Sequence, residues 1–163
     1  LVSPTPPWLL IVGFIGGGVV RGFLTGTLVL LVSLFFTDIS LSIASVLIIA
    51  GFAFLTALVF ALAGLVNGIY AKSMDGISIV PTFVLTPLVY LGGVFYSIHT
   101  LPEWWQTLTY ANPLFYLING FRYGFLGVAD VSLWLSFLVL FSLIGVLGSV
   151  NWYLIRTGLG LKQ

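Results

Sequence analysis

Charged residues are scarce in this sequence of 163 residues: Asp, Glu, Lys and Arg together make up only 6% of it. A soluble globular domain contains about 25% charged residues, because its surface has to be hydrated. Hydrophobic residues account for 60% of the chain, which leaves too little polar material to cover a soluble globule. The composition therefore predicts an integral membrane protein whose solvent is the lipid bilayer.

Cysteine is absent and histidine occurs once, at His99. The absence of cysteine excludes disulfide and thiolate sites within this sequence, and a lone histidine without a nearby second ligand does not predict a metal site. Neither the phosphate-binding pattern GxxxxGK[ST] nor the zinc-protease pattern HExxH occurs. Basic residues form no cluster. We therefore expect no catalytic activity, cofactor or metal in this chain, and no nucleic-acid partner.

Long apolar runs dominate the rest of the sequence. An α-helix rises about 1.5 Å per residue, so about 20 apolar residues cross the hydrocarbon core of a bilayer. Pro81 and Pro87 interrupt one of the runs, and each removes a backbone donor, so we expect a kink or local unwinding there. The predicted fold class is all-α integral membrane, a single domain with four transmembrane helices at about 8–36, 41–71, 77–97 and 131–155.

Two further apolar pieces, at about 101–111 and 113–127, are too short to cross a bilayer. Thr100 and Glu103 have the spacing of a capping box, which predicts the start of the first piece. Asn112 followed by Pro113 is typical of an N-cap and the first turn of a helix. We therefore predict two short helices that lie in the membrane interface without spanning it.

Arg21 lies well inside the first apolar run. An ionised side chain in hydrocarbon is costly and usually faces protein or water. The nearest acid, Asp38, would lie about 25 Å away along a helix. Two interpretations stay open, a structural hydrogen bond to backbone carbonyls or a place on a polar pathway. Asn67, near the end of the second run, is the other intramembrane polar candidate.

Glycines recur at four-residue spacing in the first run, at Gly18, Gly22 and Gly26. This spacing places them on one face of a helix and gives that face a smooth strip that a second helix can approach closely. The partner helix belongs either to the same subunit or to a second copy across a dimer seam.

The distribution of basic residues predicts an orientation. Four crossings put Lys72, Arg156 and Lys162 on one side of the membrane and Arg122 on the other. Positive charge accumulates on the cytoplasmic side, so we expect a cytoplasmic C-terminus and short helices on the outer face. The chain starts at Leu1, and no basic segment precedes its first apolar run. We therefore expect a fragment of a longer protein without a signal peptide.

Three blocks of sequence carry a family resemblance: NGIYAKSMDGISIVPTFVLTPLVYLGGVFYS, LP-x-WWQ and NPLFYLINGFRYGFLG. In combination they closely resemble permease subunits of ABC-2 type transporters, in particular a bacterial inner-membrane subgroup that pairs with a separate ATPase. The resemblance extends back to LVSPTP and implies six membrane helices, with a cytoplasmic coupling helix between the second and third. Two short helices dip into the outer leaflet before the last span. This chain would hold the last four spans.

The resemblance also assigns residues. The end of the coupling element, which receives mechanical force from the ATPase, corresponds to Val2, Ser3 and Pro4. Gly92 and Gly93 match a bend that leads into the short helices, with simple packing as the alternative. The outer-leaflet helices themselves correspond to Glu103–Tyr110 and Leu114–Phe125.

Arg122 lies in the second of these short helices. One interpretation is snorkelling of its side chain to lipid headgroups. The other gives it a place on the transport path or between subunits.

The function that the resemblance implies is a membrane-spanning permease subunit of an ATP-driven exporter in the bacterial inner membrane. Two copies would form the substrate path in the bilayer, and a separate subunit would bind ATP and Mg²⁺. A non-transporting scaffold or assembly subunit is the alternative from another class. An ion channel is disfavoured, because the sequence has no ring-forming acids and no filter-like loop. The sequence does not select a drug, a lipid or a polysaccharide as the substrate.

Overall fold

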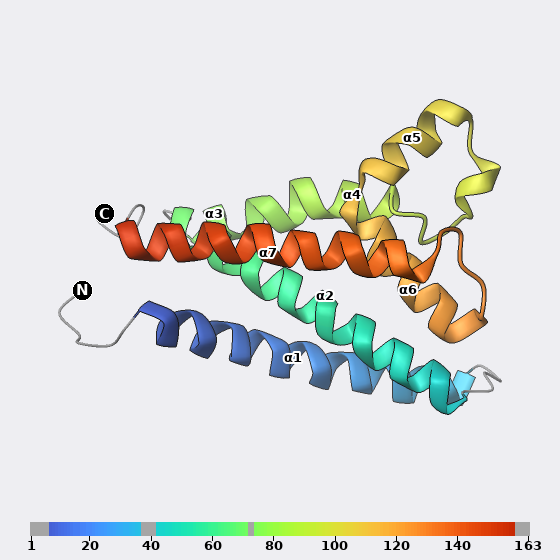
Figure 1. The fold of residues 1–163 in the computed structure, drawn as a ribbon, viewed down its shortest axis with the longest axis horizontal. Helices are drawn as coiled ribbons and strands as arrows, with labels where there is room; N and C mark the ends of the chain where they lie inside the picture. The colour runs from blue at the N-terminus through green and yellow to red at the C-terminus, as the bar shows by residue number, and fades with distance from the viewer. Residues whose placement is uncertain (1–6, 37–41, 72–73, 159–163) are drawn as a thin grey trace.

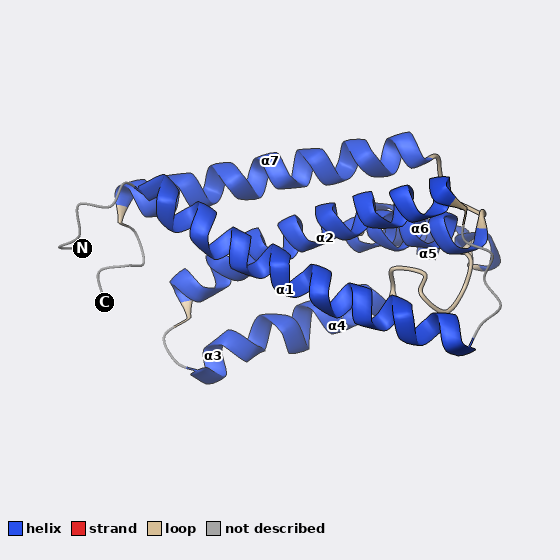
Figure 2. Ribbon diagram, turned by 90° about the horizontal axis from the view of Figure 1, so that it is seen from below, coloured by secondary structure: helices blue, strands red, loops and turns tan. Residues whose placement is uncertain are grey.

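The computed structural model describes residues 7–36, 42–71 and 74–158, and this part of the chain consists of helices and connecting turns without a strand (Figures 1 and 2). Its three long helices are α1 (Pro7–Phe36), α2 (Ile43–Tyr70) and α7 (Leu133–Thr157). Each is long and apolar enough to cross a membrane. In Figure 1 the start of α1 and the end of α7 lie at one end of the bundle, and the short helices drawn in yellow and orange lie at the other.

The third apolar run forms a continuous but irregular helix of three parts: α3 (Met74–Ile79), the π-helical η1 (Val80–Leu85) and α4 (Thr86–Tyr90). Pro81 has no N–H to donate, and around it the backbone hydrogen bonds join residues five apart instead of four, as in a π-helix. The carbonyl of Pro81 accepts hydrogen bonds from the backbone N–H of Thr86 and from its Oγ1, at 3.2 Å. The predicted local unwinding at the prolines is confirmed.

This helix ends at Tyr90, seven residues short of the end that the sequence predicted for the third span. The N–H of Gly92 donates to the carbonyl of Val89 in a tight final turn. Gly93 then takes φ of +82°, a left-handed conformation that glycine adopts without steric cost. The prediction of one helix over 77–97 is therefore wrong: Gly76–Tyr90 is a shorter apolar helix, followed by a turn.

The first short helix, α5 (Glu103–Ala111), starts later than predicted. The prediction of a capping box is wrong. Thr100 belongs to a 3₁₀ turn, η2 (Ile98–Thr100), and its Oγ1 donates to the carbonyl of Ser97 at 2.7 Å. Leu101 precedes Pro102 and is extended, since the proline ring excludes the helical region for the residue before it. The helix therefore starts only after Pro102.

The second short helix, α6 (Pro113–Leu126), starts as predicted. Asn112 Oδ1 accepts a hydrogen bond from the N–H of Leu114 at 3.0 Å, and Pro113 occupies the first turn. The helix ends at Gly127, whose φ is +70°. The predicted asparagine cap is confirmed, because all of its determinants are neighbours in the sequence.

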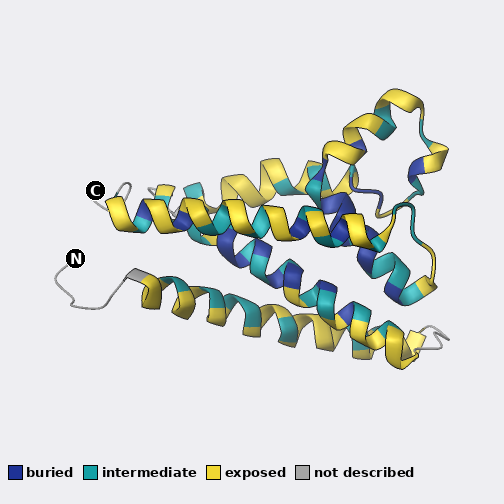
Figure 3. Ribbon diagram, in the orientation of Figure 1, coloured by how far each residue is buried: buried dark blue, intermediate teal, exposed yellow. Residues whose placement is uncertain are grey.

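The core lies where α6 packs between α2 and α7, and Figure 3 shows the buried residues concentrated on α2 and α6. Two glycines permit this close packing. A Cβ added to Gly120 would lie 2.2 Å from the ring of Phe52, and one added to Gly124 would lie 2.5 Å from Ile49. α6 therefore belongs to the interior of the bundle. The apolar cluster around it contains Phe52, Leu55, Leu114, Leu117 and Leu140.

Helix α1 lies at the edge of the bundle and packs on one side against α2 (Figures 1 and 3). A Cβ added to Gly18 would lie 2.9 Å from Cβ of Ala61, and one added to Gly22 would lie 3.1 Å from Cβ of Ala57. These two glycines of the predicted strip therefore serve packing within the same subunit. An added Cβ on Gly26 meets nothing within 4 Å.

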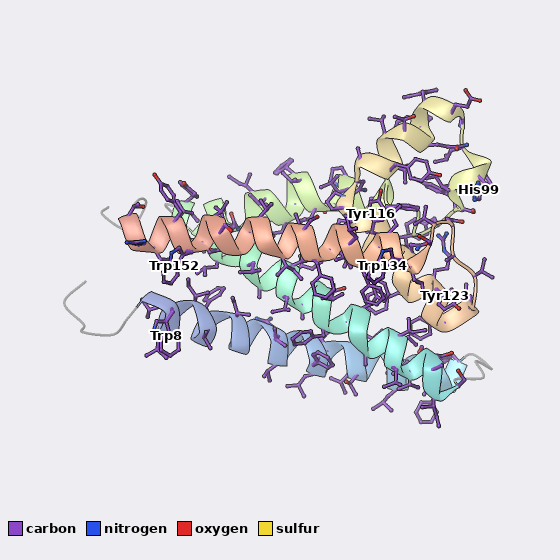
Figure 4. All side chains as sticks on the ribbon, in the orientation of Figure 1. Trp8, His99, Tyr116, Tyr123, Trp134 and Trp152 are labelled. Carbon is purple, nitrogen blue, oxygen red and sulfur yellow. The ribbon has the colours of Figure 1, made fainter. Side chains whose placement is uncertain are left out.

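Aromatic side chains mark both ends of the bundle. Figure 4 places Trp8 and Trp152 near the end where α1 starts and α7 ends, and Trp134, Tyr123 and His99 toward the opposite end. Amphipathic aromatic rings concentrate at the two interfaces of a membrane. The arrangement is consistent with a bilayer whose plane is perpendicular to the long helices.

Candidate functional site: the Arg122 cluster

A polar cluster joins α6 to the turn after α4 and to the loop before α7. It consists of Arg122, Asn119, Asp130 and Ser97, with the backbone carbonyls of Gly93 and Tyr96, and we call it the Arg122 cluster. Its members come from positions 93–97, 119–122 and 130. It lies at the end of the bundle that carries the two short helices (Figure 1).

Arg122 provides the charged donor of the cluster. Its guanidinium group donates to the carboxylate of Asp130 and to the carbonyl of Gly93, and it also donates to the carbonyl of Tyr96 at 3.1 Å. Its side chain is only 16% exposed. The planar guanidinium fork can satisfy several acceptors at once. Arg122 is therefore directed into the protein, which does not match the snorkelling interpretation.

Asp130 is the matching acceptor, with a side chain only 5% exposed. Ser97 Oγ donates to it at 2.7 Å, and the N–H of Ile98 donates at 3.4 Å. Burial by itself raises the pKa of Asp130. The hydrogen bonds from Ser97 and Ile98 and the charge of Arg122 outweigh burial, so the pKa is lowered below its ordinary value. Asp130 therefore remains a carboxylate and holds the ion pair at neutral pH.

Asn119 lies one helical turn before Arg122 and is fully buried. Its Nδ2 donates to the carbonyl of Val131 and to Ser136 Oγ, both at 3.0 Å. Its Oδ1 accepts from the N–H of Asp130 at 2.8 Å and from that of Val131 at 3.3 Å. This amide therefore fixes the loop that positions Asp130, and all of its donors and acceptors are satisfied.

The bend and the short helices meet at this cluster. A Cβ added to Gly92 would lie 2.6 Å from Cδ1 of Ile118 on α6, so any larger residue there would force the end of the Ile118 side chain to move. The N–H of Gly92 bonds to Val89, and Asn112 Nδ2 donates to the carbonyl of Leu88 at 2.6 Å. Asn112 thus caps α6 and also ties it to the end of α4.

The structure brings together the predicted site residues of the outer segment: Gly92, Gly93, Asn112, Pro113 and Arg122. Neither Asn119 nor Asp130 was predicted from the sequence to belong to a site. A recognisable signal for Asn119 was its amide in an apolar helix three residues before Arg122, since residues at this spacing share a helix face.

The other predicted candidates lie apart from this cluster. Asn67 Nδ2 donates to the carbonyl of Ile77 at 2.8 Å and joins the end of α2 to α3. Arg21 is exposed on α1, and the described part of the chain offers it no hydrogen-bond acceptor or acid. Val2, Ser3 and Pro4 lie outside the described residues, as do Asp38, Lys72 and Lys162.

The chemistry of the cluster is structural. Its carboxylate and guanidinium neutralise each other. The hydroxyl of Ser97 donates to Asp130, and the amide of Asn119 bonds to backbone and to Ser136. Among the described residues no three His, Cys, Asp or Glu side chains gather that could hold a metal ion. The arrangement can hold α6, the turn at Gly93 and the start of α7 as one unit.

The chain is similar in sequence to known membrane proteins. The chain is 51% identical over all 163 residues to the inner membrane transport permease YadH of Escherichia coli K12 and to the protein of the same name in Shigella flexneri. It spans 63% of the length of these relatives. No solved structure gives a significant match. The family model for the ABC-2 type transporter matches residues 1–126. The chain belongs to the ABC-2 type transporter family.

Proposed function

We propose that this chain is part of the membrane-spanning permease subunit of an ATP-driven exporter. Membership of the ABC-2 type transporter family supports a role in transport. The absence of a phosphate-binding loop in the sequence fits a subunit that takes its energy from a separate ATPase. ATP and Mg²⁺ would bind to that partner, and two permease copies would form the path for the substrate.

The proposed topology has four crossings, which would be part of a six-helix fold. α1, α2 and α7 supply three of them, and the irregular helix α3–η1–α4 supplies the fourth. The course of this helix, from the end with the termini to the end with the short helices, supports a crossing (Figure 1). The relatives are named inner membrane permeases, and we propose the same membrane here. The excess of basic residues near the C-terminus supports a cytoplasmic tail.

One observation supports a more specific role: Arg122 on α6 donates a hydrogen bond to the carbonyl of Gly93 and so clamps α6 to the turn after α4. α5 and α6 are too short to span. The Arg122 cluster holds α6 to the turn after α4, and Asn112, which lies between α5 and α6, bonds to the end of α4. We propose that this hairpin closes the export path on the outer side. It would move together with α4 when the ATPase switches the permease between its states.

Coupling to the ATPase is proposed at the opposite end of the bundle. Val2, Ser3 and Pro4 precede α1 in the sequence, and α1 starts at the end of the bundle where α7 ends (Figure 1). The outer hairpin and this coupling point are then on opposite sides of the membrane. A conformational change at one end would be transmitted to the other through the packed helices α1, α2 and α6.

The test is to express the full-length protein with the ATPase encoded beside its gene, to purify the complex through a tag on the permease, and to reconstitute it in vesicles. We expect the ATPase to co-purify and to hydrolyse ATP in the vesicles. Failure of any ATPase to associate would overturn the exporter proposal and favour a non-transporting scaffold. Conductance of the permease alone without ATP would favour a channel.

A further inference from the structure

Arg21 lies near the middle of α1, the 30-residue helix Pro7–Phe36. At 1.5 Å per residue it is about 21 Å from either end of the helix, which is farther than an arginine side chain reaches. Its side chain is exposed, and the described part of the chain supplies no acceptor for it. A guanidinium at this depth is costly unless protein or water faces it. Something outside the described residues therefore has to satisfy Arg21.

The surface around Arg21 has a shape that fits another helix. Gly13 and Gly17 precede it at four-residue spacing, and an added Cβ on either glycine meets nothing within 4 Å. Leu24 and Leu28 continue the same face, each 63% exposed. We call these five residues the Arg21 face. It is distinct from the face on which Gly18 and Gly22 already pack against α2.

The charges of this chain disfavour a second copy as the occupant. Its acids are Asp38, Asp75, Glu103 and Asp130, and none of them lies within the three long helices. Asp130 is already engaged by Arg122. A second copy would bring the same groups, and a two-fold contact through α1 would bring its Arg21 toward the first one. A second copy thus has no acid to offer at the required depth.

We propose that the Arg21 face is the docking surface for a membrane helix of the same polypeptide that lies outside residues 1–163. The chain covers only 63% of the length of its relatives, so a polypeptide of their length has room for such a helix. The docking helix would approach closely at Gly13 and Gly17. Its chemical requirement is an acidic side chain at the depth of Arg21, the group that a second copy lacks there.

The test uses the full-length protein in its native membrane. A photo-crosslinking amino acid replaces Leu28, and a protease site is introduced just ahead of Leu1. We expect that, after irradiation and cleavage, the preceding segment remains covalently joined to the part that begins at residue 1. The matched control is the same probe at Leu138 on α7, which is similarly exposed at 55% and should not retain that segment.

Each other outcome has a definite meaning. A crosslinked pair of complete chains from position 28 would overturn the proposal in favour of a second copy. Reaction with lipid or water alone would overturn it, because no helix would then cover the Arg21 face. Either result would leave the permease function proposed above unaffected, because co-purification with the ATPase tests that function separately.

Substitutions separate charge from shape. Arg21→Leu should lower the crosslinking yield at position 28 by roughly threefold or more, whereas Arg21→Lys should retain most of it. Gly17→Leu should also lower the yield, because it fills the strip that the docking helix needs. Gly145→Leu is the matched control, since Gly145 lies on α7 and an added Cβ there meets nothing within 4 Å. Equal losses from both glycine variants would contradict the proposal.

Discussion

At the scale of single residues, the ion pair between Arg122 and Asp130 shows how few groups hold the outer segment. Both side chains are largely removed from solvent, at 16% and 5% exposure. Removing one partner from such a pair leaves the other charge buried without compensation, which costs more than the pair itself contributes. The two carbonyls that Arg122 also satisfies, those of Gly93 and Tyr96, would lose their donor in the same step.

The first prediction concerns Arg122. Arg122→Leu should lower the free energy of unfolding by about 2–4 kcal/mol, because Asp130 and two carbonyls lose a charged donor. Arg122→Lys should cost less, since its ammonium can still pair with Asp130 but lacks the planar fork. The measurement is thermal unfolding of the purified full-length protein in detergent. Equal stability of Arg122→Leu and the parent would contradict a clamp.

The second prediction concerns pH. The pKa of Asp130 is lowered in the folded state, so the unfolded state takes up this proton at a higher pH than the folded state does. The stabilisation by the carboxylate is fully present above the unfolded-state pKa, about 3.9. It is lost as the pH falls through the lower folded-state value.

The measurement compares thermal unfolding of the parent with that of Asp130→Asn across pH 3 to 7. The difference in melting temperature between the two proteins should stay constant from pH 5 to 7 and should narrow only below about pH 4. A gap that already closed at pH 6 would show that the pKa of Asp130 is raised instead of lowered.

At the scale of elements, the short helices differ in their surroundings. α6 is buried between α2 and α7, whereas α5 projects from the bundle and exposes most of its residues (Figure 3). The two are nevertheless joined through Asn112, which caps α6 and holds the carbonyl of Leu88 at the end of α4. The turn at Gly92 and Gly93 is therefore the point where the irregular helix and the hairpin are connected.

The third prediction concerns this turn. Gly93→Leu should place a side chain at φ of +82° and close to the carbonyl of Tyr96, where L-residues are strained. We expect it to insert into the membrane normally and to impair transport-coupled ATP hydrolysis in the reconstituted complex. Gly127→Leu is the control, because Gly127 also has positive φ, +70°, but lies in open space.

Membrane insertion is checked by the amount of protein recovered from washed membranes. Gly127→Leu should carry a similar backbone strain and leave coupling intact. Parent-like activity of Gly93→Leu, or equal impairment by both variants, would count against a special role for the bend.

At the scale of the whole molecule, the bundle has two ends of different character. Both described termini, with Trp8 and Trp152 nearby, lie at one end, and the Arg122 cluster and His99 lie at the other (Figures 1 and 4). The proposed orientation places the first end in the cytoplasm. Because this sequence contains no cysteine, single introduced thiols can report on each end separately.

The fourth prediction is the accessibility of these thiols. A cysteine at His99, which is exposed in η2, should react with a membrane-impermeant maleimide added to cells whose outer membrane alone is permeable. A cysteine at Thr157, exposed at the end of α7, should react only after the inner membrane is opened. The reverse pattern would contradict the proposed orientation, and any native cysteine elsewhere in the full-length protein is first replaced by serine.

The sequence alone predicted the features that depend on neighbouring residues or on the solvent. Apolar runs form helices because backbone groups in lipid must bond within their own segment. The start of α6 was predictable from Asn112 and Pro113, whose cap closes within three residues. The disturbance at Pro81 was predictable from its missing donor. The start of α5 was missed because the capping-box pattern ignored the constraint that Pro102 places on Leu101.

Only the tertiary structure decided which of these local features meet. Asp130 contacts Arg122 across eight residues and Ser97 across 33, and these contacts exist only because α6 turns back into the bundle. The glycines of α1 look alike in the sequence, yet Gly18 and Gly22 are covered by α2 while Gly13 and Gly17 remain open. Helix formation is local, whereas the choice of which face is covered depends on how neighbouring helices fit together. The spacing of small residues shows that another helix can approach closely, but it does not determine which helix does so.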